Sequence, residues 1–300
     1  MDFVEISVDL SARLVDACAV TMDQIYSEEF WRLFDDLDSS LNPAGPEQLY
    51  EVADPYMNAA HRILDIGCRD ARHLIELVRR YDAIGIGLDP VAWHVERAQT
   101  AVEAAGLAGQ ITIRLGVAED LAEEAASIDI IWCRDVIEVL PDLPTALAEM
   151  HRVLRTGGHL VAYTSVLRGP VDPVETATIH EPLGNVVANL VEPDLESAFG
   201  AAGFQISSKC IVGTQWREHL EEHNQTVSRD LLRLARLRRD SDRITERYGQ
   251  HAYRTAEASL QWGLHQLLGR FIPVIYVLAP AGRGPQRSED TRHQAGGAGP

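Results

Sequence analysis

Cysteine is scarce in this sequence, and the cysteines that occur lie far apart. The 300 residues include four of them, Cys18, Cys68, Cys133 and Cys210. No two form a C-x-x-C pair, which disfavours a cysteine-based zinc site and a disulfide framework. We therefore expect reduced, mostly buried thiols and no bound metal.

Long apolar runs are also lacking. None reaches the ~18 to 20 residues that a membrane-spanning helix needs. The N-terminus, MDFVEISVDL, has neither the basic region nor the long apolar stretch of a signal peptide. We expect a cytoplasmic protein that does not enter a membrane. Hydrophobic residues make up 46% of the chain, which is enough for a sizeable core.

Positive charge is in short supply. Lysine and arginine number 27 against 45 aspartates and glutamates, so the formal net charge is −18, and Lys209 is the only lysine. An acidic surface repels a phosphate backbone. The charge therefore argues against a nucleic-acid substrate.

The order of apolar patterns along the chain predicts an α/β fold. Residues 1–60 have helical spacing, interrupted by a loop at 42–46, and we expect an N-terminal helical cap. From residue 61, short apolar strands alternate with helical stretches, as in a Rossmann-like, seven-stranded, mostly parallel sheet with helices on both faces. Strands are expected at Arg62–Ile66, Ala83–Leu88, Ile111–Gly116, Ile128–Cys133, Gly158–Ser165, Phe204–Val212 and Phe271–Leu278. The intervening helices are expected at Ala71–Tyr81, Ala92–Gly106, Leu143–Leu154 and Pro193–Ala202.

A helical segment interrupts the end of this pattern. Leucines at helical spacing fill residues 214–270, so we expect a helical lid inserted before the last strand. The core then comprises 61–213 and 271–280. Residues 281–300 are rich in Gly, Pro and Arg, and we expect a disordered tail.

Two strand ends carry the residues expected of a nucleoside site. The first strand ends in Asp65-Ile66-Gly67, and a glycine there lets the backbone approach a ligand closely. The second strand ends at Asp89, 24 positions after Asp65, where a carboxylate can accept hydrogen bonds from ribose hydroxyls. The helix after Gly67 offers free N–H groups to an anion.

Five segments in order resemble the class I S-adenosylmethionine-dependent methyltransferases, in particular the small-molecule enzymes of ubiquinone, sterol and natural-product metabolism. They are Asp65-Ile66-Gly67-Cys68, Asp89, residues 116–121 (GVAEDL), residues 133–143 (CRDVIEVLPDL) and residues 148–158 (AEMHRVLRTGG). The resemblance implies S-adenosylmethionine as the cofactor. The residues that it implies for binding the cofactor are Asp65, Gly67, Cys68, Arg69, Asp89, Pro90, Ala118, Glu119 and Arg134.

One departure from the family pattern leaves an alternative open. The family usually has GxGxG where this chain has Gly67-Cys68-Arg69-Asp70-Ala71. A non-catalytic protein that keeps the fold as a binding or scaffolding module is therefore a second hypothesis. A nicotinamide oxidoreductase is disfavoured because Gly67 is the only glycine of this turn. A base-amine methyltransferase is disfavoured because residues 134–137 read RDVI and not Asn/Asp-Pro-Pro-aromatic.

The resemblance implies methyl transfer to an oxygen, nitrogen or carbon atom of a small metabolite. A base is needed where the nucleophile carries a proton, and we expect His180 or Asp135 to supply it, with His219 and His223 as further candidates. His219 to His223 also matches H-x-x-E-H, but the charged flanks favour a solvated helix over a zinc site. Tyr26, Trp31 and Trp216 are candidates for lining the acceptor pocket. A homodimer is compatible with the sequence.

Overall fold

The computed structural model describes residues 25–281 of the chain, in two units, 1–43 and 44–300, that are considered separately. In the first unit, helix α3 (Glu28–Leu37) begins after Ser27, whose hydroxyl accepts a hydrogen bond from the backbone N–H of Phe30 at 3.1 Å. Trp31 is 60% exposed on this helix. The remainder of the predicted cap before residue 25, Cys18 and the tail from residue 282 lie outside the described residues.

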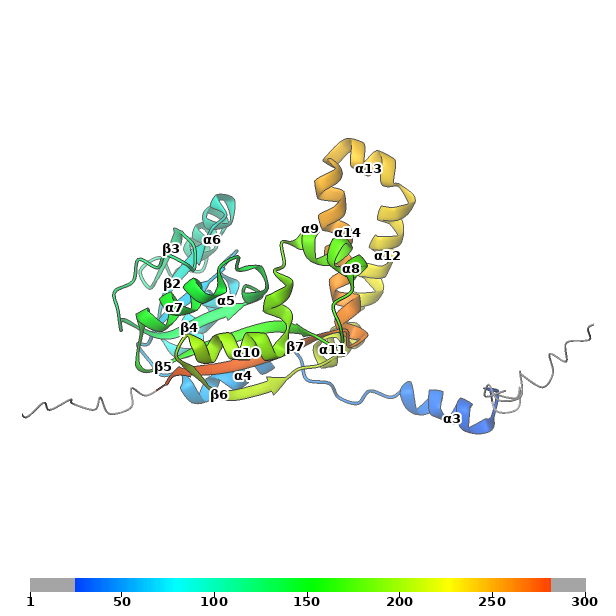
Figure 1. Ribbon diagram of the computed structural model, residues 1–300, viewed down its shortest axis with the longest axis horizontal. Helices are drawn as coiled ribbons and strands as arrows, with labels where there is room; N and C mark the ends of the chain where they lie inside the picture. Colours follow the sequence, from blue (N-terminus) through cyan, green and yellow to red (C-terminus); the bar gives the residue numbers. More distant parts are fainter. Residues whose placement is uncertain (1–24, 282–300) are drawn as a thin grey trace, which may run out of the picture. The chain divides into compact units, whose positions relative to one another are not determined.

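The second unit is built on a seven-stranded sheet in the order β3-β2-β1-β4-β5-β7-β6 (Figure 1). Strands β1 to β5 are parallel, and β7 is antiparallel to both β5 and β6. The prediction of a seven-stranded, mostly parallel Rossmann-like sheet is confirmed. The strands are β1 (Arg62–Ile66), β2 (Ile84–Asp89), β3 (Ile111–Leu115), β4 (Ile128–Arg134), β5 (Leu154–Leu167), β6 (Phe204–Ile211) and β7 (Phe271–Pro280).

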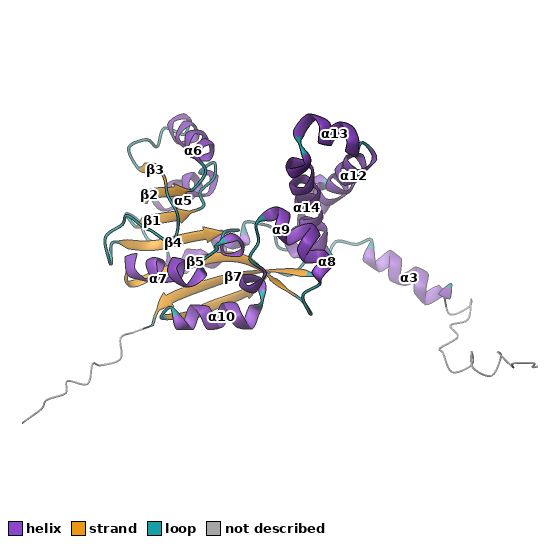
Figure 2. Cartoon of the chain, turned by 45° about the horizontal axis from the view of Figure 1, so that its top comes forward, coloured by secondary structure: helices purple, strands orange, loops and turns teal. Residues whose placement is uncertain are grey.

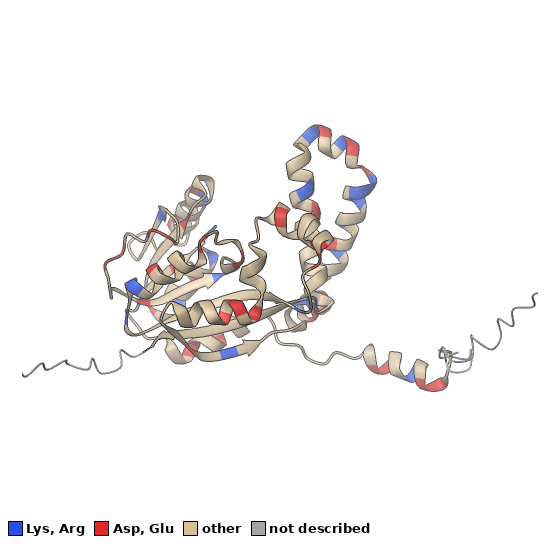
Figure 3. Ribbon diagram, in the orientation of Figure 1, with Lys and Arg blue, Asp and Glu red and all other residues tan. Residues whose placement is uncertain are grey.

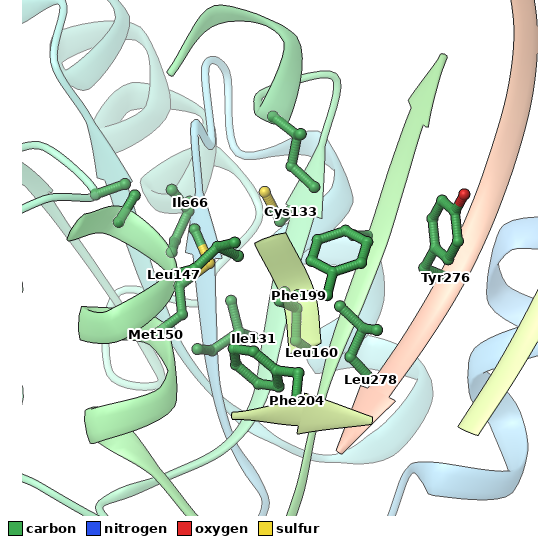
Figure 4. Close-up of a cluster of buried hydrophobic side chains, with 14 of the residues drawn as sticks. Ile66, Ile131, Cys133, Leu147, Met150, Leu160, Phe199, Phe204, Tyr276 and Leu278 are labelled. Atoms are coloured by element: carbon green, nitrogen blue, oxygen red, sulfur yellow. The ribbon is translucent and has the colours of Figure 1, made fainter. Parts of the chain in front are cut away.

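Helices cover both faces of the sheet, and each face has its own hydrophobic cluster. Ile131 and Cys133 of β4 belong to the cluster under α7 (Leu143–Val153) and α10 (Glu192–Ala201), which Figure 4 shows in close-up. Ile130 and Trp132 point to the opposite face, under α4 (Gln48–Ala53), α5 (Arg72–Tyr81) and α6 (Ala92–Ala104). Burial on both faces explains why the central strands read as continuous apolar runs.

Four helices fill the segment between β6 and β7, which is called the helical insert here. They are α11 (Gln215–Asn224), α12 (Thr226–Arg239), α13 (Ser241–Tyr248) and α14 (Gln250–Leu267). Figures 1 and 2 show α12 and α13 extending away from the sheet and α14 returning to it. Charged residues of both signs are spread along these helices (Figure 3), and Nε of Arg238 on α12 lies 2.7 Å from Oε1 of Glu257 on α14.

Short helical turns between β5 and α10 were not predicted from the sequence. They comprise α8 (Pro173–Glu175), the π-helical turn η3 (Thr176–His180), α9 (Glu181–Leu183) and the 3-10 turn η4 (Val187–Leu190). Arg270, just before β7, donates to both carboxylate oxygens of Glu175 at 2.8 Å and so holds this segment from outside. A further 3-10 turn, η1 (Asp54–Tyr56), precedes β1, and another, η2 (Ile137–Val139), follows β4.

Neither a membrane-spanning helix nor a metal site is found in the described part of the chain. No helix within residues 25–281 is long and apolar enough to cross a membrane. No group of three His, Cys, Asp or Glu side chains there is arranged to hold a metal ion. His219 and His223 stack on each other at 4.0 Å on α11. Cys68, Cys133 and Cys210 are free thiols.

Candidate active site

The point where the strand order reverses lies between β1 and β4. The chain runs from β1 outward through β2 and β3, then returns to β4 on the other side of β1 and continues to β5. Ligands of open parallel sheets bind beyond the carboxyl ends of the strands at such a point. Two cavities lie there, of about 210 and 460 Å³, and Val139 lines both.

The loop after β1 keeps a glycine-like backbone although it has one glycine. Gly67, Arg69 and Ala71 all have positive φ, at 74°, 52° and 57°. These are the three positions of the GxGxG pattern. An L-residue in this region costs roughly 1 to 2 kcal/mol. The loop therefore places two residues with side chains, Arg69 and Ala71, in a backbone conformation that favours glycine, and it is strained there.

Space as well as backbone angle requires the first glycine. A Cβ atom at Gly67 would lie 2.4 Å from Cγ2 of Val136. Gly116, after β3, is as tightly placed, because its Cβ would lie 2.4 Å from Cδ1 of Leu88. Both glycines line the smaller cavity, so they keep open a space that any side chain would fill.

Asp89 ends β2 with its carboxylate held by the chain. Oδ2 accepts from the backbone N–H of Arg69 at 2.9 Å, and Oδ1 accepts from that of Val91 at 2.9 Å. Nδ1 of His94 lies 3.1 Å from Oδ1. A carboxylate has about four acceptor positions. One position therefore remains, on Oδ2, and it is the one that a ribose hydroxyl would use.

The smaller cavity is largely apolar and lies at the carboxyl ends of the strands, where the nucleobase of a cofactor is expected to bind. Glu119 lines it with one carboxylate oxygen, Oε1, that is buried and has no hydrogen-bond partner. Such an oxygen can accept from an exocyclic amine. Four of the residues predicted to bind the cofactor line this cavity, namely Gly67, Pro90, Ala118 and Glu119. The other lining residues are Ile66, Leu88, Gly116, Val117, Val136, Val139, Leu140 and Pro141.

The larger cavity is polar and lies between the core and the helical insert. Arg69 and Arg134, which were predicted to bind the cofactor, line this cavity. Asp135, which was predicted as a base, also lines it, and its side chain is 46% exposed. Core residues Glu138, Val139 and Tyr163 meet Arg217, Asp230, Ser259, Trp262 and Gln266 of the insert there, with Leu183 and Asn185 between them.

The guanidinium group of Arg134 is positioned by a hydrogen bond to His73, which in turn contacts Tyr50. Its Nη1 lies 2.8 Å from Nε2 of His73, and Arg134 can only donate, so Nε2 accepts and Nδ1 carries the proton. Nδ1 lies 2.7 Å from the hydroxyl oxygen of Tyr50. Burial, with the Arg134 charge, lowers the pKa of His73 to about 4, which keeps this histidine neutral.

Asp65 and Cys68 lie beneath the cavities rather than in their walls. Asp65 is 3% exposed, and burial raises the pKa of its carboxyl to about 8 despite the nearby Arg134 charge. Burial also raises the pKa of the Cys68 thiol, which makes it unreactive. The Cys68 side chain packs among the residues under α5, so only its backbone faces the turn.

Glu138 is a candidate that sequence reasoning missed. It lies in the segment 133–143 already quoted, but its neighbours gave no sign that its side chain would turn inward. It is 4% exposed and lines the larger cavity. Oε1 accepts from the backbone N–H of Ser165 at 3.3 Å, whereas Oε2 is buried and has no partner. Burial, with the Asp135 charge, raises the pKa of Glu138 to about 8.

His180 does not reach either cavity. It is fully buried, 3.4 Å from Oε1 of Glu175, and its ring lies against Trp262 and Phe271. Burial lowers its pKa. It adjoins two walls of the larger cavity, Trp262 and Asn185, and Nδ2 of Asn185 lies 3.4 Å from Nδ1 of His180. These contacts hold a buried ring in place, and a catalytic part for His180 stays a prediction.

The three aromatic residues predicted to line the acceptor pocket lie in different units of the chain. Trp216 is 5% exposed and stacks on Tyr163, a wall of the larger cavity, with ring centroids 4.7 Å apart. It supports the cavity from behind and does not line it. Tyr26 and Trp31 lie in the first unit, and both are exposed there.

Comparison with known proteins gives a family for the core. Residues 64–162 match a family model described as a methyltransferase domain. Methyltransferase GfsG of Streptomyces halstedii is 35% identical over 133 residues, which cover 44% of this chain and 47% of that protein. The ubiquinone biosynthesis O-methyltransferase of Azorhizobium caulinodans is 28% identical over 155 residues, which cover 49% and 59%. The chain spans about half the length of these curated relatives.

Solved structures share the fold. The cyclase SpnF superposes with a TM-score of 0.60 at 20% identity, covering 79% of this chain and 82% of that one. A S-adenosylmethionine-dependent methyltransferase from Thiobacillus denitrificans, in complex with S-adenosylhomocysteine, has a TM-score of 0.56 at 19% identity, covering 83% and 98%. With the family match, these likenesses confirm the predicted class I methyltransferase fold.

Proposed function

We propose that this chain, whose residues 64–162 form a methyltransferase domain, transfers a methyl group from S-adenosylmethionine to an oxygen, nitrogen or carbon atom of a small molecule. The observation that carries the proposal is the pair of adjoining cavities at the switch point of the sheet. One is apolar and base-sized, the other is polar and closed partly by the helical insert. Val139 lines both cavities. The base of a cofactor would lie in the smaller cavity, and its other end would reach the arginines of the larger cavity, where the acceptor would also bind.

The chain's residues fit this cofactor. The orphaned Oε1 of Glu119 suits the exocyclic amine of adenine, and the remaining acceptor position on Asp89 suits a ribose hydroxyl. The buried carboxyl of Asp65 suits an ammonium group, which would favour its ionised form. Arg69 and Arg134, in the wall of the larger cavity, suit a carboxylate. Gly67, Pro90 and Ala118 supply backbone and apolar surface, and Cys68 supports the turn.

The protein's task in such a reaction is to orient and to exclude water. S-adenosylmethionine, when bound, supplies a methyl group that is already electrophilic at its sulfonium. Holding two reactants in the right orientation can lower the activation free energy of their reaction by several kcal/mol. The turn of residues 137–140 is braced for this task, because Nδ2 of Asn189 donates to the carbonyl oxygens of Ile137 and Leu140, each at 2.9 Å.

The acceptor is expected to be a natural-product-like or quinone-like metabolite bound under the helical insert. The curated relatives are named as methyltransferases of such compounds, including a 27-O-demethylrifamycin SV methyltransferase of Amycolatopsis mediterranei. Trp262 and Leu183 offer apolar surface in the larger cavity, among many polar groups. The net charge of −18 disfavours a nucleic acid in this role. We also propose a cytoplasmic location; a homodimer remains compatible with the sequence.

The experiment is a screen for S-adenosylhomocysteine release. The full chain is incubated with S-adenosylmethionine and a panel of hydroxylated macrocycles, quinols, phenols and amines, alongside Asp89→Asn and, as a matched control, Asp120→Asn in an exposed position. Turnover with some acceptor, lost in Asp89→Asn and kept in Asp120→Asn, is expected. Cofactor binding without turnover on any acceptor class would favour the scaffold hypothesis, or a reaction other than methyl transfer.

A further inference from the structure

The polar groups of the larger cavity include one that neither cofactor binding nor packing explains. Glu138 is buried, and its Oε2 makes no hydrogen bond within residues 25–281, although the hydroxyl of Thr164 lies close enough to oppose the rise in the pKa of Glu138. Leaving such an atom unpaired is costly, so native proteins keep it where a ligand or a reaction uses it. The residue Glu138 belongs to the wall of the larger cavity, next in sequence to Val139, which also lines the smaller cavity.

The placement of Glu138 is built by both the core and the insert. The backbone N–H of Ser165 donates to Oε1, and the hydroxyl of Ser165 accepts from Nε2 of Gln266 at 3.0 Å. Oε1 of Gln266 accepts in turn from Nε of Arg217 at 2.7 Å. This chain of hydrogen bonds runs from α11 through α14 to Ser165 of β5, whose backbone N–H donates to Glu138.

We propose that Glu138 takes the proton from the acceptor and that the acceptor is a hydroxyl compound, an alcohol or a phenol. This inference rests on the proposed function. In the step, the hydroxyl oxygen gives its proton to Oε2 of Glu138 and forms a bond to the methyl carbon. The carbon–sulfur bond breaks, and its electron pair stays on sulfur, which becomes a neutral thioether. A neutral amine attacks with a free lone pair and needs no such base beforehand, whereas a hydroxyl does.

The charges around Glu138 govern when it is ionised. The acidic and neutral groups that face it or share its cavity are Asp135 and Cys133 near the end of β4, Tyr163 on β5 and Asp230 on α12. The positive groups that share the cavity are the guanidinium groups of Arg69, Arg134 and Arg217. With its pKa raised to about 8, the carboxyl is mostly protonated at neutral pH in the free protein. A positive charge placed nearby lowers a carboxyl pKa by about 1 to 3 units. Binding of the sulfonium form should therefore expel a proton and produce the base.

Calorimetry tests this coupling without any acceptor. S-adenosylmethionine and S-adenosylhomocysteine are each titrated into the full chain at pH 7.5, in buffers of different ionisation enthalpy. The two ligands differ at the sulfur, so the difference in proton release isolates the sulfonium charge. We expect S-adenosylmethionine to release about 0.5 to 0.7 proton more than S-adenosylhomocysteine, from a pKa of about 8 that falls by 1 to 2 units.

Two variants test whether Glu138 is the group that releases the extra proton. In Glu138→Gln, which keeps the side-chain shape, the difference between the two ligands should vanish while S-adenosylhomocysteine still binds. Asp129→Asn removes a buried carboxyl at the opposite end of β4, outside both cavities, and should retain the difference. A difference that persists in Glu138→Gln, or that is absent from the wild type, overturns the inference but leaves the proposed function standing. Failure of the folded wild type to bind either ligand contradicts the proposed function itself, and the inference with it.

The pH dependence in the wild type is a second readout that needs no variant. The extra proton released with S-adenosylmethionine should fall toward zero at pH 5, where Glu138 stays protonated in both states. An extra release that is unchanged between pH 5 and pH 7.5 contradicts the assignment, because a group with this pKa cannot produce it.

Discussion

Replacing Glu138 by glutamine should make the protein more stable at high pH than the wild type. The folded-state pKa of Glu138 is about 8, against an ordinary value of 4.5. Between these values the folded protein holds a proton that the unfolded chain has lost. The wild type therefore loses stability as pH rises from 4.5 to 8, and an amide at this position does not titrate.

The magnitude follows from the two pKa values. Each unit of difference corresponds to about 1.4 kcal/mol, so the stability gained by the variant should grow by about 4 kcal/mol between pH 5 and pH 8.5. Any constant cost of burying the amide cancels when the two pH values are compared. Asp65 titrates in both proteins and also cancels to first order.

The assay is denaturant unfolding of wild type and Glu138→Gln at pH 5, 7 and 8.5. Glu103→Gln, at an exposed position on α6, is the matched control and should follow the wild type at every pH. A Glu138→Gln difference that does not change with pH would show that Glu138 is ionised in the free protein. The proton coupling inferred for the site would then have no source.

Three further variants test single features of the site. Gly67→Ala should lower stability by about 2 to 4 kcal/mol and abolish S-adenosylhomocysteine binding, because its φ is +74° and its Cβ would meet Val136; thermal unfolding and calorimetry measure both. Arg69→Gly should raise the free energy of unfolding slightly, by up to about 1 kcal/mol, because glycine adopts the positive φ of this position without strain. Preserved binding of S-adenosylhomocysteine to this variant would show that the turn does not depend on the arginine. His180→Gln should cost about 1 to 3 kcal/mol of stability and leave ligand affinity unchanged; a loss of affinity without a loss of stability would restore its predicted part in catalysis.

The architecture could be predicted from the sequence because its signals are local. Central strands such as Ile128–Arg134 are apolar on both faces, and the helices between them have clear ends. Strand bounds differ from the predicted ones by a few residues at most, the largest difference being the earlier start of β5 at Leu154. The turns at 173–190 were missed because each is too short to show a period, and distant residues such as Arg270 stabilise them.

The site could be predicted only in part, for a reason that the loop at 67–71 illustrates. The sequence has Arg69 and Ala71 where glycines are common, and the structure gives both residues the positive φ angles that favour glycine. Backbone strain of this kind is stabilised by surrounding structure and leaves no local pattern. Glu138 was missed for a related reason. Its burial depends on Ser165 and on the helical insert, both distant in sequence.

The most direct test of the central claim is calorimetric titration of S-adenosylhomocysteine into the full chain and into Asp89→Ala. We predict micromolar binding to the wild type that is lost in the variant, because the carboxylate of Asp89 has one acceptor position left for a ribose hydroxyl. Absence of binding to a folded wild type would contradict the account, and the non-catalytic scaffold would become the leading hypothesis.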